Sequence, residues 1–327
     1  MGIQEGREAL IFGYAIEGNT RILDRANITQ YGESSYLSRT PSLGNNIIHL
    51  AARSGKTTFV DAAIRLFPDL LWQKNNNDNT VVHEAAAEMG TKDCVRFLIS
   101  YLKSSMSSST TSSASDHNRS NATAIAVPFL LERNCDGETP FHVALRCRNM
   151  AAAEELFADV NTRQQILHIK NNCGETPLHL YARYCAGGTF PKDLEHDDNH
   201  NVVDKPKFIK ALITANSAAI FEQDSDGFIP VMRAAQYGRV HAVLWMLSYK
   251  QSTECRDLKG RNVLHHLRLR IADLNARDKD YTFWICKKIL ALCEVYTLIF
   301  LQDKDGNTPL HLAIMDRDFD IAELILK

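Results

Sequence analysis

Two segments of the sequence contain residue types that could do chemistry. Residues 195–200 hold His196 and His200 among three carboxylates, a composition that could bind a metal ion. Residues 54–57 read Ser-Gly-Lys-Thr and resemble the end of a phosphate-binding loop, in which backbone amides and a lysine hold phosphate groups. These segments are the candidates for a metal site and a nucleotide site.

Neither segment has the surroundings that its chemistry requires. Glycine, proline and asparagine around His196 and His200 predict a loop without a rigid element to preorganise metal ligands. Leu50 stands where the phosphate-binding motif needs its first glycine, and residues 49–52 predict a helix instead of the preceding strand. The sequence also contains no G-x-S-x-G, H-E-x-x-H or dinucleotide-binding glycine motif. We therefore predict a protein that is not an enzyme and has no cofactor and no metal.

Composition and charge narrow the class of protein further. The 327 residues include 37 Lys plus Arg and 39 Asp plus Glu, so no bulk basic excess points to nucleic acid, and we predict no nucleic-acid partner. The most apolar stretch, residues 289–301, is interrupted by Glu294 and is shorter than the ~20 residues that a spanning helix needs. Eight cysteines without a C-x-x-C pair predict reduced thiols. We expect a cytoplasmic protein without a direct membrane span in this chain.

A short motif recurs along the chain and indicates how the helices are organised. Residues 305–313 read Asp-Gly-Asn-Thr-Pro-Leu-His-Leu-Ala, residues 136–144 read Asp-Gly-Glu-Thr-Pro-Phe-His-Val-Ala, and residues 173–180 read Cys-Gly-Glu-Thr-Pro-Leu-His-Leu. Indexed on the histidine or its equivalent, the copies lie at 49, 83, 142, 179, 232, 265 and 311, with spacings of 34, 59, 37, 53, 33 and 46. Three spacings are close to a period of about 33 residues, and three contain insertions.

The chemistry of the motif predicts a tight turn followed by a helix. Asp-Gly allows the positive φ of the turn, threonine caps the helix, and proline fits its first turn because the missing amide would have no helical partner. Segments such as residues 59–67, 94–99 and 240–247 have apolar residues at helical spacing and predict a second helix in each repeat. Gly55, Gly90 and Gly238 are then turn glycines between the paired helices.

These residues resemble ankyrin repeats, and the resemblance implies the fold. It implies an all-α solenoid, a stack of helix pairs with short β-hairpin or turn connections. It also implies that the motif histidine is structural, because in the family this side chain hydrogen-bonds the threonine and neighbouring backbone. The residues concerned are His49, His83, His142, His179, His265 and His311. Cys147 and Cys185 lie near two of them in sequence, but a histidine committed to the motif is not free for catalysis.

We predict a single array over residues 1–327 with three insertions. A divergent N-terminal repeat covers residues 1–44, and insert loops cover about residues 104–123, 187–206 and 269–282. The first insert is rich in serine and threonine and predicts a flexible loop, either a phosphorylated regulatory loop or a neutral expansion. The third has mixed charges and predicts longer helices within its repeat.

The resemblance implies a non-catalytic module that binds a partner protein along a concave groove of loop tips and inner helices. The candidate groove positions lie four and five residues after the motif histidine. They are Arg53, Glu88, Arg146, Arg183, Tyr184, Gln236, Tyr237 and Met315. Arginine with tyrosine is a composition that favours interface hot spots, so we expect a protein partner with an acidic segment. The alternatives are that the arginines are simply solvated, and that the insert loops bind the partner.

A finer resemblance lies in residues 67–75, Phe-Pro-Asp-Leu-Leu-Trp-Gln-Lys-Asn. This linker is similar to that of plant ankyrin-repeat transmembrane proteins linked to immunity and cell death, which implies a role in plant defence signalling. The alternative function is the cytosolic sensor or tethering portion of a membrane channel or other membrane protein. Residues 321–327 form an apolar second helix without a polar capping repeat, so we expect either a longer protein beyond Lys327, at the cytosolic face of a membrane, or self-association through the open repeat.

Overall fold

The computed structural model describes residues 2–107, 129–185, 207–247, 249–269, 276–292 and 297–326. The chain divides into two compact units, Met1–Asn172 and Cys173–Lys327, and the predicted array spans both. Within the described ranges the regular elements are helices, with no strand, and the connections between them are turns. None of the described helices is long and apolar enough to cross a membrane.

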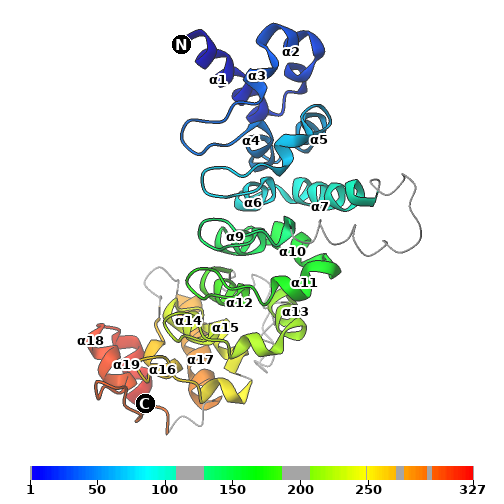
Figure 1. Ribbon diagram of the computed structural model, residues 1–327. Helices are drawn as coiled ribbons and strands as arrows, with labels where there is room; N and C mark the ends of the chain where they lie inside the picture. Colours follow the sequence, from blue (N-terminus) through cyan, green and yellow to red (C-terminus); the bar gives the residue numbers. More distant parts are fainter. Residues whose placement is uncertain are drawn as a thin grey trace, which may run out of the picture. The chain divides into compact units, whose positions relative to one another are not determined.

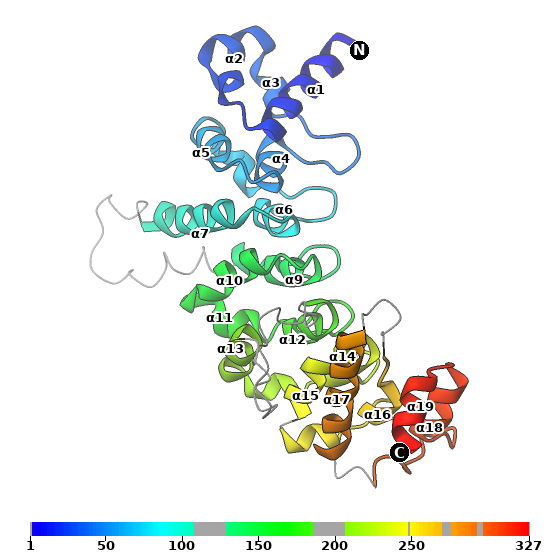
Figure 2. The ribbon, with the colours of Figure 1, turned by 180° about the vertical axis from the view of Figure 1, so that it is seen from behind.

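The first unit consists of successive helix pairs. Its described helices are α1 (Gly2–Glu17), η1 (Thr20–Leu23), α2 (Arg25–Tyr31), α3 (Glu33–Tyr36), α4 (Ile47–Arg53), α5 (Thr57–Leu66), η2 (Pro68–Trp72), α6 (Val81–Ala87), α7 (Lys92–Ser107), α9 (Pro140–Arg146), α10 (Met150–Ala158) and α11 (Val160–Ile166). The inner helices α4, α6 and α9 follow one another, and the second helices α5, α7 and α10 lie beside them (Figures 1 and 2). Ala52 and Ala86 on successive inner helices are fully buried, because small side chains let these helices approach closely.

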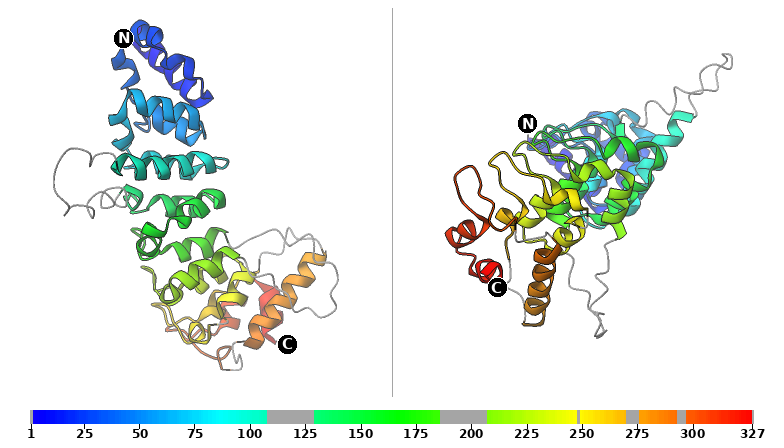
Figure 3. Two further views of the ribbon diagram at one scale, coloured as in Figure 1. Left: turned by 90° about the vertical axis from the view of Figure 1, so that its right-hand side faces the viewer. Right: turned by 90° about the horizontal axis from the view of Figure 1, so that it is seen from below.

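The second unit contains helix pairs of less regular length. Its described helices are α12 (Pro177–Leu180), η4 (Tyr181–Cys185, a π-helical turn), α13 (Lys207–Ala215), η5 (Ser217–Ile220), α14 (Pro230–Gln236), α15 (Val240–Leu247), η6 (Lys250–Thr253), α16 (Val263–His266), α17 (Ala276–Leu292), α18 (Pro309–Met315) and α19 (Phe319–Leu326). The long helix α17, orange in Figure 3, packs along α15 and buries Ile285, Cys286 and Ile289. Residues 276–282 of the third insert belong to α17, and residues 270–275 lie outside the described residues.

One Asn or Asp side chain anchors the loop before five of the described inner helices, whereas Thr40 accepts from the Asn45 amide in the loop before α4. In the first unit the Oδ1 atoms of Asn75 and Asn134 accept hydrogen bonds from the backbone amides two and four residues later, at 2.9–3.0 Å. In the second unit Asp224, Asp257 and Asp303 do the same at 2.8–3.0 Å. The loops are thus fixed by the same geometry but with a neutral amide in one unit and a carboxylate in the other.

Neighbouring loop tips are also joined by the backbone. The amide of Asn76 donates to the carbonyl of Leu43 at 2.9 Å, and the amide of Cys135 donates to the carbonyl of Asn77 at 3.0 Å. In the second unit the amide of Lys304 donates to the carbonyl of Lys259 at 2.9 Å. These bonds hold the loop tips in register with one another.

The turn between paired helices requires a positive φ. Gly55 and Gly238 adopt φ of 69° and 67°, so the Ser-Gly-Lys-Thr segment is the turn between α4 and α5 and not a phosphate-binding loop. Arg148 occupies the same turn between α9 and α10 with φ of 60°, a conformation that strains a residue with a Cβ atom.

Replacing Arg148 with glycine should therefore stabilise the protein. The exposed Arg148 side chain makes no hydrogen bond or ion pair with the described residues, so relief of backbone strain is the main effect. The relief is partly offset by the greater freedom of glycine in the unfolded chain, which leaves a net gain of about 0.5–1 kcal/mol. Urea unfolding measures this gain. Arg148→Ala keeps the strain and is the control, and equal stability of the two variants would contradict the argument.

Candidate functional site

The motif histidines bind the loop that follows them in the stack. In all five buried cases the Nδ1 atom accepts a hydrogen bond from the backbone amide of the N-cap residue. In four of them Nδ1 also lies 2.8–2.9 Å from a threonine hydroxyl or asparagine oxygen. In the fifth, His49, the bond from the Asn46 amide is 3.4 Å long. The Nε2 atoms lie 2.9–3.2 Å from backbone carbonyls of the following loops. The pairs are His49 with Asn79, His83 with Glu138, His142 with Ile169, His179 with Phe228, and His265 with Asn307.

These contacts fix the charge state of the imidazoles. A carbonyl can only accept, so Nε2 carries the proton and Nδ1 acts as the acceptor. Burial lowers the pKa of His49 and of His83 to about 4, and burial also lowers the pKa of His179 and His265. Both ring nitrogens are therefore used by the fold, and neither is available as a metal ligand or a general base.

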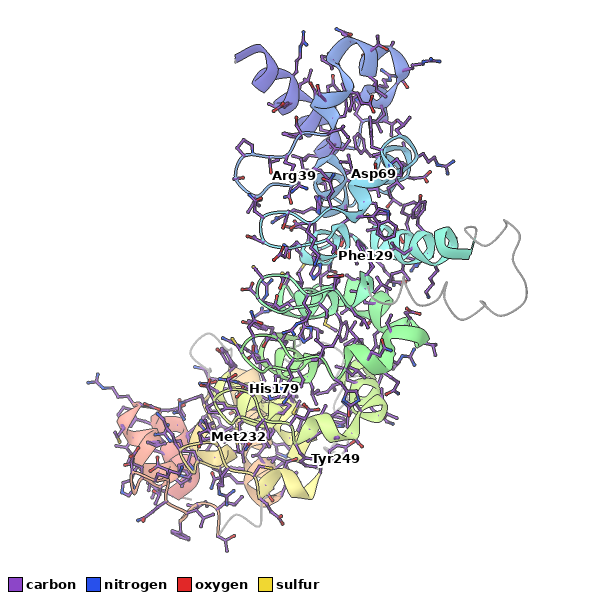
Figure 4. The ribbon with its side chains drawn as sticks, in the orientation of Figure 1. Arg39, Asp69, Phe129, His179, Met232 and Tyr249 are labelled. Carbon is purple, nitrogen blue, oxygen red and sulfur yellow. The ribbon has the colours of Figure 1, made fainter. Side chains whose placement is uncertain are left out.

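Two of the seven positions depart from this arrangement. Met232, labelled with His179 in Figure 4, occupies the histidine position of α14 and is fully buried. His311 keeps its Nδ1 contacts with Thr308 at 3.0–3.1 Å, but the imidazole is exposed.

In the first unit, the candidate arginines on the inner helices are already paired with carboxylates. Arg53 on α4 donates from Nη1 to Glu84 at 3.3 Å and from Nη2 to Glu88 at 3.0 Å. Arg146 on α9 donates from Nε to both oxygens of Glu138, at 2.9–3.0 Å. Glu84 and Glu138 are buried, so their charges depend on these arginines. The structure therefore does not present the arginines as a row of free positive charge.

In the second unit, the guanidinium group of one candidate arginine lies against the rings of two candidate tyrosines. Arg183 lies on the π-helical turn η4, and its guanidinium carbon lies 5.0 Å from the Tyr184 ring centroid and 4.9 Å from that of Tyr237. Its Nη1 donates to the buried Glu175 at 3.2 Å. Gln236 of α14 accepts a hydrogen bond from Arg233 of the same helix at 3.0 Å. We call Arg183, Tyr184, Gln236 and Tyr237 the arginine–tyrosine cluster.

A second arginine beneath this cluster was not among the sequence candidates. Arg233 is 8% exposed, and its guanidinium bonds Asp224 and Asp226 at 2.7 Å and lies 4.0 Å from Glu175. Its guanidinium carbon also lies 4.2 Å from the ring centroid of Phe228. Arg233 follows the Met that replaces the motif histidine, and no repeating pattern marks it in the sequence.

The remaining candidate positions lie apart from this cluster. Glu88 is half exposed beside Arg53, and Met315 at the end of α18 is 67% exposed. His196, His200 and the serine-rich insert lie outside the described residues. In the parts of the chain that the structure describes, no three or more His, Cys, Asp and Glu side chains gather into a group that could hold a metal ion.

Comparison with known proteins agrees with this geometry. The family described as ankyrin repeats (3 copies) matches residues 48–165, and the single ankyrin repeat matches residues 305–327. The chain contains ankyrin repeats. A search of curated proteins finds no match.

Similarity to a solved structure supports the same ankyrin-repeat fold. The crystal structure of the ankyrin repeat domain of Bcl-3, described as a unique member of the IkappaB protein family, matches with a TM-score of 0.52 and 18% identity. The match covers 86% of this chain and 97% of that one. The fold is therefore an all-α ankyrin solenoid, and its repeats indicate a protein–protein interaction module.

Proposed function

We propose that this ankyrin-repeat chain captures a partner protein through the exposed residues of its inner helices, without catalysis. The arginine–tyrosine cluster of the second unit is the observation that carries the proposal. Arginine and tyrosine are the residue types that dominate binding energy at interfaces. Ion pairing to the buried Glu175 and contact with two rings already restrict Arg183, so binding costs little additional side-chain entropy.

We propose further that the partner contributes an acidic segment. Supporting this, Arg146 and Arg183 are 40% and 29% exposed at their side chains, and each bonds its glutamate through one nitrogen. A partner carboxylate would share the guanidinium group with that glutamate. An interaction of this kind weakens as ionic strength rises, whereas apolar contact with the tyrosine rings does not.

Selection from a displayed random-peptide library tests the proposal without a known partner. Peptides selected on the chain should lose at least about tenfold in affinity on the double variant Tyr184→Ser, Tyr237→Ser, because truncating hot-spot residues typically costs 2 kcal/mol or more. Fluorescence polarisation measures the affinity, and circular dichroism shows that both proteins are folded. The matched control is Val160→Ser, which changes a side chain that is 73% exposed in the first unit.

The outcomes separate the two parts of the proposal. Peptides that bind both proteins equally would contradict the inner-helix surface. Peptides that depend on the tyrosines but bind equally in 50 mM and 500 mM salt would retain the surface and remove the acidic segment. Arg→Glu substitutions are unsuitable here, because they would place a second carboxylate beside Glu138 or Glu175 and destabilise the fold itself.

We propose a more specific role for the module, either in plant immune or cell-death signalling or as the cytosolic sensor or tether of a membrane protein. It is motivated by the linker at residues 67–75, in which Leu70 and Leu71 are buried in η2 while Trp72 is 42% exposed. Burial explains the two leucines by packing alone, so the proposal depends on the exposed part of the linker. Loss of membrane-fraction recovery in Trp72→Ser would support the tether.

We also propose self-association through the last repeat. Phe319 and Leu326 of α19 are 65% and 71% exposed, which is unusual for large apolar side chains.

A further inference from the structure

Three arginines occupy the same position, four residues after the motif histidine, but they use different edges of the guanidinium group. They are Arg53, Arg146 and Arg183. Arg53 bonds two glutamates through both of its terminal nitrogens, Nη1 and Nη2, at 3.3 and 3.0 Å. Arg183 bonds Glu175 through Nη1 at 3.2 Å. Arg146 bonds through Nε, so no described residue occupies its terminal edge, and its side chain is 40% exposed.

The other edge of Arg146 is anchored to a fixed part of the first unit. Its Nε donates to both carboxylate oxygens of the buried Glu138, at 3.0 and 2.9 Å. The Glu138 backbone is held in turn, because its amide donates to Asn134 Oδ1 at 2.9 Å and its carbonyl accepts from His83 Nε2 at 2.9 Å. The terminal edge is therefore oriented before a partner arrives, and ordering it on binding costs little entropy.

The charges around this terminal edge favour a single carboxylate as its ligand. Glu138 balances the charge of Arg146 itself. Asp136, an exposed acid in the loop before α9, acts electrostatically on Arg146, and the exposed Arg148 offsets it two residues after Arg146. A carboxylate brings one negative charge to this balanced group, whereas a phosphate group brings close to two and would be repelled more strongly by the two acids.

We infer that the terminal edge of Arg146 binds one aspartate or glutamate side chain of the partner protein through two parallel N–H···O hydrogen bonds. The inference rests on the proposed capture of a partner with an acidic segment, and it assigns the carboxylate of that segment to one residue of the first unit. Glu138 is the positioning residue, because it fixes Nε. Paired hydrogen bonds between arginine and a carboxylate are strong and directional, so this contact selects for an acid at one position of the partner.

The peptides selected on the chain, synthesised with amidated C-termini, are the probes that test the inference. Amidation leaves side-chain carboxylates as the only ones available. Arg146→Lys keeps the charge but lacks the planar edge, so peptides with an acidic residue should lose at least about tenfold in affinity by fluorescence polarisation. Arg65→Lys on the second helix α5, where the side chain is 73% exposed, is the matched control and should bind like the wild type. Circular dichroism shows that each variant is folded.

A double-mutant cycle separates the contact from a structural effect of Arg146. Each Asp or Glu of a peptide is replaced in turn by Asn or Gln. One replacement should weaken binding to the wild-type chain by at least about tenfold but weaken binding to Arg146→Lys by less than about threefold, because the contact is already lost there. Equal losses on both proteins at every acidic position would overturn the inference, as would a selection that returns only peptides without Asp or Glu.

Other outcomes distinguish this inference from the proposed function. Equal losses in Arg146→Lys and Arg53→Lys would overturn the assignment to a free terminal edge, because the terminal edge of Arg53 is occupied. Peptides that need Tyr184 and Tyr237 but bind Arg146→Lys with wild-type affinity would overturn the inference and retain the proposed function. Peptides that need Arg146 but neither tyrosine would retain the inference and overturn the role of the arginine–tyrosine cluster.

Discussion

Replacing Arg233 with methionine is expected to lower the free energy of unfolding of the second unit by about 3–5 kcal/mol. The change leaves the carboxylate of Asp224, which is fully buried, without a cation, and it also removes the arginine nearest to Glu175 after Arg183. Breaking a buried ion pair from one side costs this much because the remaining charge stays away from water. Urea unfolding followed by circular dichroism measures the loss.

The structure of the first unit provides a rescue for this variant. Asn75 and Asn134 anchor their loops with the same backbone hydrogen bonds as Asp224, but without a charge. Adding Asp224→Asn to Arg233→Met should therefore recover at least about half of the lost stability. Asp226→Asn is the control, because this carboxylate is 68% exposed, and it should cost less than about 1 kcal/mol. A loss below 1 kcal/mol in Arg233→Met itself would show that the pair is not a stabilising element.

Stability is also expected to fall steeply as the pH is lowered from about 6.5 to about 4. The buried histidines are neutral in the folded protein, with the pKa of His49 and His83 lowered to about 4, and in the unfolded chain they accept a proton near their ordinary pKa of ~6.5. Between these values the unfolded state binds more protons than the folded state, so acid favours unfolding. Each such histidine contributes a slope of up to about 1.4 kcal/mol per pH unit.

The same sign applies to the second unit. Burial lowers the pKa of His179, His241, His265 and His266, the last against the opposing effect of a hydrogen bond with Asp257 at 3.0 Å. Below about pH 4 the lowered pKa values of Asp257 and Asp303 extend the loss, because these carboxylates favour the folded state only when charged. Unfolding free energies measured at pH 7.5, 6.5, 5.5 and 4.5 give the slope. His83→Asn should lower this slope by up to the contribution of one titrating proton, which is about 1.4 kcal/mol per pH unit. An unfolding free energy that is constant from pH 7 to pH 5 would rule out the mechanism.

Most of the fold could be predicted from the repeat motif, because the interactions of the motif are local in sequence. Threonine caps, proline at the first turn and the Gly55 and Gly238 turns depend on residues within a few positions of one another, so the sequence pattern and the structure agree there. The loop anchors also have a local signal that the sequence interpretation did not use. Asn or Asp stands eight residues before the motif position in six repeats, at 75, 134, 171, 224, 257 and 303.

The candidate site was less predictable, because pairing across a helix or between repeats decides its charge. Glu138 and Arg146, like Glu175 and Arg183, stand four residues before and four residues after a motif histidine, so this recurring pair was visible in principle. Arg53 instead pairs with Glu84 of the next repeat, and only the stacking geometry brings them together. The π-helical turn at Tyr181–Cys185 and the burial of Arg233 follow from tertiary packing and leave no pattern in the sequence.

The two kinds of loop anchor should make the two units differ in their resistance to deamidation. Asparagine is a thermolabile residue, and hydrolysis of its amide turns it into aspartate. At Asn75 that conversion would place a new carboxylate against Glu84, to which the amide now donates at 2.9 Å, so Arg53 beside Glu84 would face two acids in place of one. Asp224, Asp257 and Asp303 are already acids with a cationic or imidazole partner within 3.0 Å, so the same ageing reaction has nothing to alter there. In a protein stored for long periods, damage at the loop anchors should therefore accumulate in the first unit alone.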